Sequence, residues 1–161
     1  MRRSDEQAYV DFVDASRPTL HAYAWLLTAD AHGAEDLLQE TFVRMYVQWR
    51  RVSSGQPLAY ARRVMSNLHT DRWRKGRRER LTDEVPETAY RSSEETAGVD
   101  VVRALQQLSP RERECVVLRH YLDLSEKDTA ATLGVSVGAV KSYTSKGLAA
   151  LRPLLREERH V

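Results

Sequence analysis

The stretch that decides the fold is SEKDTAATLGVSVGAVKSYTSKGLAALR, residues 125–152. Ala130, Gly134 and Val140 lie at the spacing of a helix-turn-helix. In that motif a small residue lets two helices approach, a glycine supplies the turn and an aliphatic side chain locks the second helix into the core. At about 100° per residue, the inner face of the second helix holds Val140, Thr144, Gly147 and Leu151.

The outer face of the same helix predicts contact with duplex DNA. It carries Lys141, Ser142, Ser145, Lys146, Ala149 and Arg152. Small side chains let a helix enter the major groove closely, and the cations beside them hold phosphates. The alternative interpretation is a solvated basic face on an ordinary helical hairpin.

Helical periodicity dominates the whole chain, and strand signals are nearly absent. The pattern predicts helices at residues 5–15, 18–28, 31–49, 57–75, 100–107, 110–121, 125–133 and 137–156. Three helix starts carry capping signals: Ser109-Pro110 with Glu112, Ser125 with Asp128, and Ser136. The fold class is therefore expected to be all-α.

Residues 76–98 interrupt this pattern, because they are polar and contain Pro86 and Gly98. Such a segment has too little apolar surface to offset its ordering entropy, which predicts a flexible linker. We therefore expect two small helical domains, residues 1–77 and 100–161, joined by a linker at 78–99. The alternative is a surface helix within one domain.

Charge changes sign along the 161-residue chain. Residues 1–43 hold three arginines and eight acidic residues, net −5, whereas residues 44–80 hold eleven basic residues against two acidic ones, net +9. Residues 81–100 return to −5 and residues 101–161 end at +3. These segments, and not the total of +2, set the field that a partner meets. The second segment is suited to a polyanion, and the first is not.

Residues 31–49 predict a helix with two faces to bury. Leu38, Phe42, Met45 and Trp49 form an apolar stripe, and the opposite side mixes carboxylates with valines: Asp36, Gln39, Glu40, Val43 and Val47. An acidic face repels DNA, so its partner is expected to be another protein. The alternative is a set of scattered surface valines.

Residues 57–75 predict an arginine-rich helix that can hold opened DNA. Ala61, Met65, Leu68 and the stem of Arg72 share one face, and Arg63, Asn67, Thr70 and Arg74 share another. Trp73 lies on a third side, near Arg62, Ser66 and His69. Cations for phosphate, an amide for a base edge and an indole for stacking suit single strands. Arg-rich amphipathic helices are common, so the pattern alone does not decide the function.

An enzyme is not expected. Glu35, Asp36 and Glu40 do not converge, the five histidines lack HxxxH or HExxH spacing, and no phosphate loop or nucleophile elbow is present. The lone Cys115 excludes an intramolecular disulfide and a CxxC zinc site. We expect no catalytic residue, cofactor or metal. Without a long apolar run or a signal segment, we also expect no membrane insertion and a cytoplasmic location.

Three blocks resemble the sigma-70 family. DAHGAEDLLQETFVRMYVQW (30–49) is similar to the family's second conserved region, and PLAYARRVMSNLHTDRWRK (57–75) to the adjoining promoter-melting and recognition helix. LSPRERECVVLRHYLDLSEKDTAATLGVSVGAVKSYTSKGLAALR (108–152) resembles the fourth region. With nothing recognisable between the blocks, the resemblance is to extracytoplasmic-function (ECF) sigma factors, particularly the short actinobacterial sigma-E-like subgroup.

The resemblance implies an RNA polymerase subunit that gives the core enzyme its promoter choice. The helix at 31–49 would dock on the clamp helices of the largest subunit, with Asp36, Gln39, Glu40 and Val43 as contacts. The helix at 57–75, with the loop at 50–56, would capture the opened strand of the −10 element. Its expected contacts are Arg63, Asn67, Thr70, Arg72, Trp73 and Arg74. In outline, a family pattern is matched by Asn67, Asp71, Arg72 and Arg74.

The same resemblance assigns the C-terminal domain to the −35 element. Lys141, Ser142, Ser145, Lys146 and Arg152 would read it, while the inner surface of the domain grips the polymerase flap. Two rival functions remain open, a stand-alone helix-turn-helix activator and a sigma mimic that titrates an anti-sigma protein. The first leaves the acidic face of 31–49 unexplained, and the basic face at 141–152 argues against the second. Whether an anti-sigma protein exists for this chain is left open.

Overall fold

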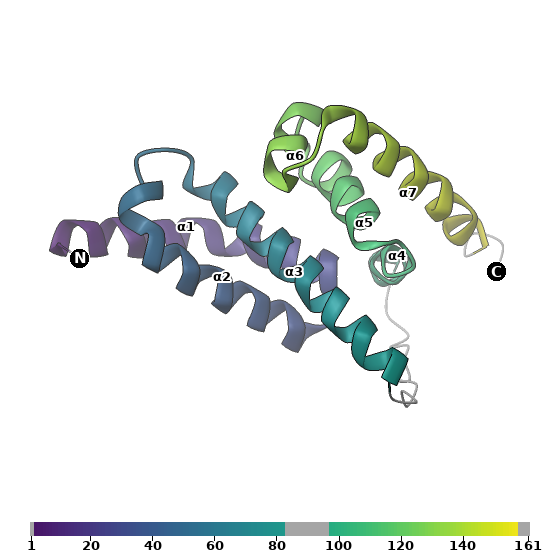
Figure 1. The fold of residues 1–161 in the computed structure, drawn as a ribbon, viewed down its shortest axis with the longest axis horizontal. Coiled ribbons are helices and arrows are strands. Elements are labelled where there is room, and N and C mark those ends of the chain that lie inside the picture. The colour runs from purple at the N-terminus through teal and green to yellow at the C-terminus, as the bar shows by residue number, and fades with distance from the viewer. Residues whose placement is uncertain (1, 83–96, 158–161) are drawn as a thin grey trace.

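The computed structural model describes residues 2–82 and 97–157, and every regular element in these ranges is helical (Figure 1). The elements are α1 (Arg3–Thr28), α2 (Ala31–Val52), α3 (Pro57–Thr82), α4 (Ala97–Leu105), α5 (Pro110–Val116), the π-helical turn η1 (Val117–Tyr121), α6 (Glu126–Leu133) and α7 (Val137–Glu157). The expected all-α class is confirmed. Residues 83–96, most of the expected linker, lie outside the described ranges, while both its ends belong to α3 and α4.

The first helix differs from expectation, because α1 runs without a break through Pro18. A proline inside a helix removes one hydrogen bond and crowds the preceding turn, at a cost of about 3 kcal/mol. Apolar side chains on both sides of Pro18 pack against the same core, so burial along the whole of α1 outweighs that cost. Ser16, two residues before the proline, is buried and donates its hydroxyl to Phe12 O at 2.6 Å.

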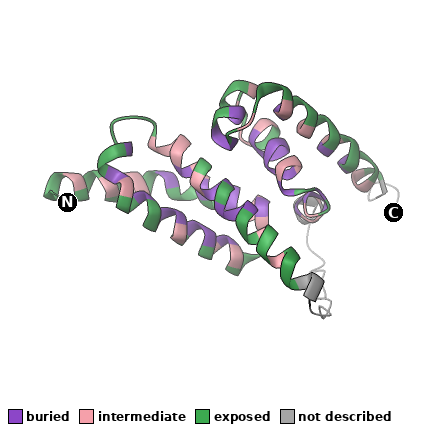
Figure 2. Cartoon of the chain, viewed as in Figure 1, coloured by how far each residue is buried: buried purple, intermediate pink, exposed green. Residues whose placement is uncertain are grey.

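Helices α1, α2 and α3 form an antiparallel bundle (Figure 1). The predicted stripe of α2, Leu38, Phe42, Met45 and Trp49, is buried, which confirms the core face assigned from spacing (Figure 2). Asp30 caps the start of α2, accepting from the backbone N–H groups of His32 and Gly33 at 3.2 and 3.1 Å. A capped start and a buried stripe on one side leave the other side of α2 facing solvent.

Helices α4 to α7 form a second unit built around the helix-turn-helix. Ser109 and Glu112 make the predicted capping box at α5, with Ser109 N to Glu112 Oε1 at 3.3 Å. Ser125 and Ser136 accept backbone N–H groups at the starts of α6 and α7, both at 3.0 Å. Gly134 ends α6 with a φ of 67°, a left-handed conformation that favours glycine. The predicted turn chemistry is confirmed.

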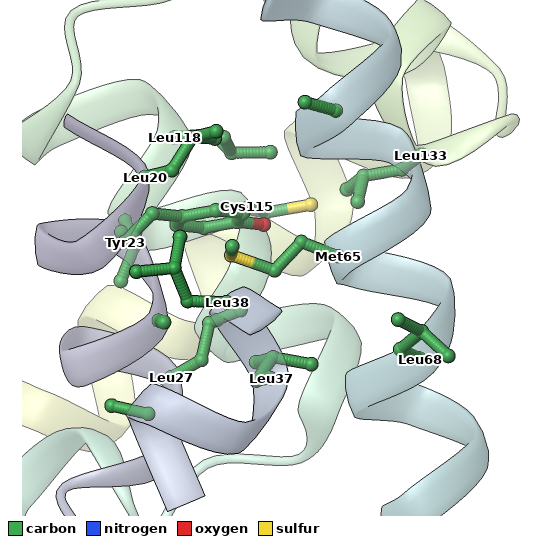
Figure 3. Packing of buried hydrophobic residues seen from close by; sticks show 14 of the residues in the cluster. Leu20, Tyr23, Leu27, Leu37, Leu38, Met65, Leu68, Cys115, Leu118 and Leu133 are labelled. Atoms are coloured by element: carbon green, nitrogen blue, oxygen red, sulfur yellow. The ribbon is translucent and has the colours of Figure 1, made fainter. Parts of the chain in front are cut away.

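The two units pack against each other with one continuous apolar core. In Figure 3, Tyr23 of α1 and Met65 of α3 lie beside Cys115 of α5 and Leu118 of η1. The sequence suggested two domains connected only by a tether, and this contact was not anticipated. It arises because α5 and α6 bury apolar side chains against α1 and α3 as well as against α7.

Candidate nucleic-acid interface

The face of α7 that is predicted to read duplex DNA is exposed to solvent. Lys141, Ser142, Ser145, Lys146 and Arg152 are all exposed, whereas Val140, Gly147 and Leu151 of the inner face are buried. Gly147 allows this close packing, since a Cβ there would lie 2.7 Å from Val116 Cγ2. The periodicity therefore separated the two faces of α7 correctly.

A hollow beside this face contains two residues that sequence reasoning missed. Arg119 of η1 and Glu126 of α6 line it together with Lys141, Ser145 and Arg152. Glu126 Oε2 lies 3.9 Å from Lys141 Nζ, so α6 supplies a counter-charge to the reading helix. Arg119 comes from a different helix, and no spacing along α7 could have indicated it.

Helix α3 has one face in the core and one in solvent, as predicted. Ala61, Met65 and Leu68 are buried against the rest of the bundle. Arg63, Asn67 and Arg74 of the predicted strand-binding face are exposed. The cations and the amide are thus available to a DNA strand.

Thr70 departs from that face, because it is only 5% exposed. Its hydroxyl donates to Glu114 Oε1 of α5 at 2.8 Å, and the neighbouring His69 Nδ1 lies 3.2 Å from the same oxygen. The side of α3 expected to gather around Trp73 is likewise covered in part: Ser66 is buried, with its hydroxyl 2.7 Å from that of Tyr23. As folded here, Thr70 is not open to DNA, because the second unit covers it.

Arg72 and Trp73 also differ from expectation. Arg72 does not lay its stem in the core: it is exposed and its Nη2 donates to Glu40 Oε2 of α2. Trp73 is half-buried, with the guanidinium carbon of Arg77 5.3 Å from its ring centroid. The indole is therefore already stacked on a cation from its own helix.

The mixed face of α2 is open. Asp36 and Gln39 are exposed, and Val43 and Val47 are 63% and 73% exposed. Glu40 pairs with Arg72 and, at 3.2 Å, with Arg44; the hydrogen bond from Arg72 is the main cause that lowers the pKa of its carboxyl. Large exposed valines beside fixed carboxylates suit a protein partner with both apolar and basic groups.

A buried polar cluster lies between the two units, and the sequence did not predict it. Glu114 is fully buried, and its Oε2 accepts from Arg111 Nη1 at 2.8 Å. Arg113 is 4% exposed and donates to Leu27 O at 2.8 Å and to Leu105 O at 2.9 Å. Arg113 thus satisfies carbonyls at the ends of α1 and α4. These two adjacent charged residues of α5 are buried because α5 packs against α1 and α3, and only the fold reveals that packing.

Three features of the described residues bear on other chemistries. They contain no cluster of three or more histidine, cysteine, aspartate or glutamate side chains able to hold a metal ion. Burial raises the pKa of the Cys115 thiol to about 12, with a further contribution from Glu114, so the thiol stays protonated at neutral pH. Among the same residues, no helix combines the length and apolar character needed to cross a membrane.

Comparison with known families matches both units. The family described as Sigma-70 region 2 matches residues 12–79, and Sigma-70, region 4 matches residues 99–151. The RNA polymerase sigma-E factor of Streptomyces avermitilis is 35% identical over 156 residues, covering 94% of this chain and 87% of that protein. The sigma-E factor of Streptomyces coelicolor is 35% identical over 148 residues, covering 89% and 84%.

A solved structure agrees with this fold. The sigma factor RpoE of Bartonella quintana, solved with the anti-sigma factor NepR, superposes with a TM-score of 0.74 at 25% identity and covers 92% of this chain and 96% of its own. These matches define a two-region sigma protein. The chain belongs to the sigma-70 family, among the RNA polymerase sigma factors of the extracytoplasmic-function type.

Proposed function

We propose that this sigma factor uses three helix faces for three contacts in transcription initiation. α2 docks on core RNA polymerase through Asp36, Gln39, Glu40 and Val43. α3 captures the opened strand of the −10 element through Arg63, Asn67, Arg72, Trp73 and Arg74. Thr70, also expected there, is covered by α5 in the packed molecule. α7 reads the duplex −35 element through Lys141, Ser142, Ser145, Lys146 and Arg152, and the inner surface of its unit contacts the polymerase flap.

One observation carries this proposal. Each of the three helices buries one stripe in the core and presents a chemically different second face to solvent. The face of α2 is acidic and apolar, that of α3 combines arginines with an amide, and that of α7 sets small residues between cations. A stand-alone helix-turn-helix activator would need only the last of these and would leave the first two without a partner.

The test compares one variant on each DNA-binding face in holoenzyme. Lys146→Ala is expected to weaken closed-complex formation on duplex promoter and to lower the salt slope of binding by about 0.9, because one phosphate contact is lost. Asn67→Ala is expected to leave that step unchanged and to reduce strand opening, because its amide meets an exposed base. Run-off transcription, filter binding and permanganate reactivity measure these steps. An identical defect at the same step in both variants would contradict the division of labour.

We also infer how the protein acts in the cell. It has no catalytic activity of its own and works in the cytoplasm with RNA polymerase. An anti-sigma protein regulates it, an inference supported by the solved relative RpoE, whose structure contains its anti-sigma factor NepR. Purification of the tagged chain from its native cells, followed by identification of bound proteins, tests this: core polymerase alone, with no second regulator, would contradict the anti-sigma inference.

A further inference from the structure

Two adjacent side chains of α3 contact the carboxylate of Glu114. Its Oε1 accepts the Thr70 hydroxyl at 2.8 Å and lies 3.2 Å from His69 Nδ1. The two donors are adjacent residues of the helix that we assign to strand capture. All three side chains are buried, with exposures of 5%, 6% and 0% for Thr70, His69 and Glu114.

The hydrogen-bond pattern indicates which ring nitrogen of His69 carries the proton. Arg113 Nη1 lies 3.0 Å from His69 Nε2, and an arginine nitrogen only donates hydrogen bonds. Nε2 is therefore the acceptor, which places the ring proton on Nδ1, facing Glu114. His69 and Thr70 thus direct two donors at one anionic oxygen.

Two arginines precede this pair along the same helix. Arg62 and Arg63 line a cavity of about 370 Å³ between α3 and α6, together with Gln56 and the acidic Asp128. Within the described part of the chain, Nε of Arg62 is buried with no hydrogen-bond partner, and burial lowers the pKa of this guanidinium. Arg62 lies about two helical turns before the Thr–His pair on α3, and arginines together with hydroxyl side chains commonly contact the phosphates of nucleic acids.

The anion comes from the other unit of the molecule. Glu114 belongs to α5, 44 residues from Thr70, and its second oxygen pairs with Arg111 of its own helix. Much of the contact between the units is apolar, and burying charges within it costs free energy that solvation returns when the interface opens. If α5 moves away from α3, Thr70 and His69 become exposed beside Asn67 and Arg74.

From this geometry we propose that Thr70 and His69 form a phosphate site for the opened promoter strand, and that the Glu114 carboxylate occupies this site while the two units are packed together. The inference rests on the proposed role of α3. Thr70 would then bind the strand only after the two units have separated. Packing of the units and strand capture then compete for the same two donors.

The experiment alters each partner of the Thr70–Glu114 hydrogen bond in turn. Thr70→Val deletes the donor and Glu114→Gln deletes the charge of the competing anion, with little change of shape in either case. Binding of the full-length chain to a fluorescent single-stranded −10 oligonucleotide is measured by anisotropy at low salt. Small-angle scattering reports whether the units have parted.

Both variants are expected to increase the radius of gyration, but only Glu114→Gln should gain strand affinity over wild type. Glu114→Gln should bind the oligonucleotide more tightly than wild type, and Thr70→Val should bind about tenfold more weakly than Glu114→Gln, since a hydrogen bond to a charged group is worth about this factor. The double variant should match Thr70→Val. Thr70→Ser, which keeps the hydroxyl, should behave as wild type.

Two controls separate the possible failures. Thr41→Val removes a buried hydroxyl that donates to Leu37 O of its own helix, and it should leave strand affinity unchanged. Circular dichroism verifies helix content in every variant. Equal strand affinities for Thr70→Val and Glu114→Gln, with Asn67→Ala still defective, would overturn the phosphate site alone. If Asn67→Ala also binds normally, the proposed role of α3 fails and the phosphate site fails with it.

Discussion

Gly147 shows how one residue sets the distance between two helices. A Cβ at this position would lie 2.7 Å from Val116 Cγ2 and 3.3 Å from Glu112 O. Because the second of these atoms is backbone, α7 must shift if any side chain is added. The spacing pattern placed Gly147 on the inner face of α7, but only the packed structure shows why no larger residue fits there.

We expect Gly147→Ala to destabilise the protein by about 1–3 kcal/mol, the usual cost of forcing extra atoms into a packed core. Gly76→Ala is the matched control: it lies inside α3 with no atom within 4 Å of an added Cβ. That control should stabilise the protein by about 0.5–1 kcal/mol, because alanine favours helix over glycine. Urea unfolding measures both. A neutral or stabilising Gly147→Ala would contradict the close approach.

Cys115 provides a chemical probe of burial. With a thiol pKa of about 12, the folded protein holds only about one ten-thousandth of this group as thiolate at pH 8. Reaction with a disulfide reagent at pH 8 is expected to be at least about a hundredfold slower in the folded protein than in urea. Absorbance of the released thiol measures the rate. Similar rates in the two conditions would show that this part of the core is open to solvent.

Helix α3 shows how the sides of a single element divide among different neighbours. One side packs in the bundle through Met65, a second is exposed at Asn67, and a third meets α5 at Thr70. Helical spacing separated the first side from the others. It did not separate the second from the third, because both are polar and differ only in what lies opposite them.

Helix α2 carries the element-scale prediction, which concerns docking on core polymerase. Asp36 is exposed and lies opposite the buried stripe. Asp36→Lys should therefore weaken binding to core polymerase at least about tenfold, because it places a cation opposite the basic groups expected on the partner. The thermal midpoint should stay within about 2 °C of wild type, because exposed substitutions usually change stability by less than about 0.5 kcal/mol. Pull-down with core polymerase and circular dichroism measure the two effects.

The control for this experiment is Asp14→Lys, which makes the same charge change at an exposed position of α1. It should bind core polymerase as wild type does. Glu40→Lys is less clean, since Glu40 also pairs with Arg72 and Arg44. Normal pull-down by Asp36→Lys would remove this residue from the docking face, and a melted fold would mean that the core side of α2 had been assigned wrongly.

The whole molecule combines two proposed DNA-binding faces on two units that pack together. The packed state covers Thr70 and His69. If both faces engage one promoter at once, the effective concentration of the second contact rises, so we expect high affinity to depend on both. Core polymerase provides the scaffold on which this can happen.

We accordingly expect the free chain to bind duplex promoter only weakly, in the range of about 10⁻⁴–10⁻⁶ M that is typical of non-specific binding at physiological salt. Addition of core polymerase should make binding sequence-specific and tighten it by at least about a thousandfold. Anisotropy with promoter and scrambled duplexes measures both states. Nanomolar, sequence-specific binding by the free chain would instead favour a stand-alone activator.

The sequence by itself determined the all-helical class, the starts of α2, α3, α5 and α7, and the apolar stripes of α2, α3 and α7 that enter the core. These features depend on local rules: a 3.6-residue period, capping side chains such as Ser109 and Ser125, and a glycine at the turn. The same rules identified the exposed faces of α2 and α7 and part of that of α3. The resemblance in motif order then indicated the family.

Only the tertiary structure decided how the two units meet, and with it the environment of Thr70 and Glu114; the pairing of Arg72 with Glu40 likewise depends on how α3 packs on α2. Thr70 and Glu114 are 44 residues apart, and no periodic pattern connects positions on separate helices across a loop. The pair of Arg111 with the buried Glu114 and the exposed pair of Arg72 with Glu40 consist of the same two residue types, so residue type alone does not reveal which pair is buried. What distinguishes them is the desolvation imposed by neighbouring helices, and that is a property of the folded packing alone.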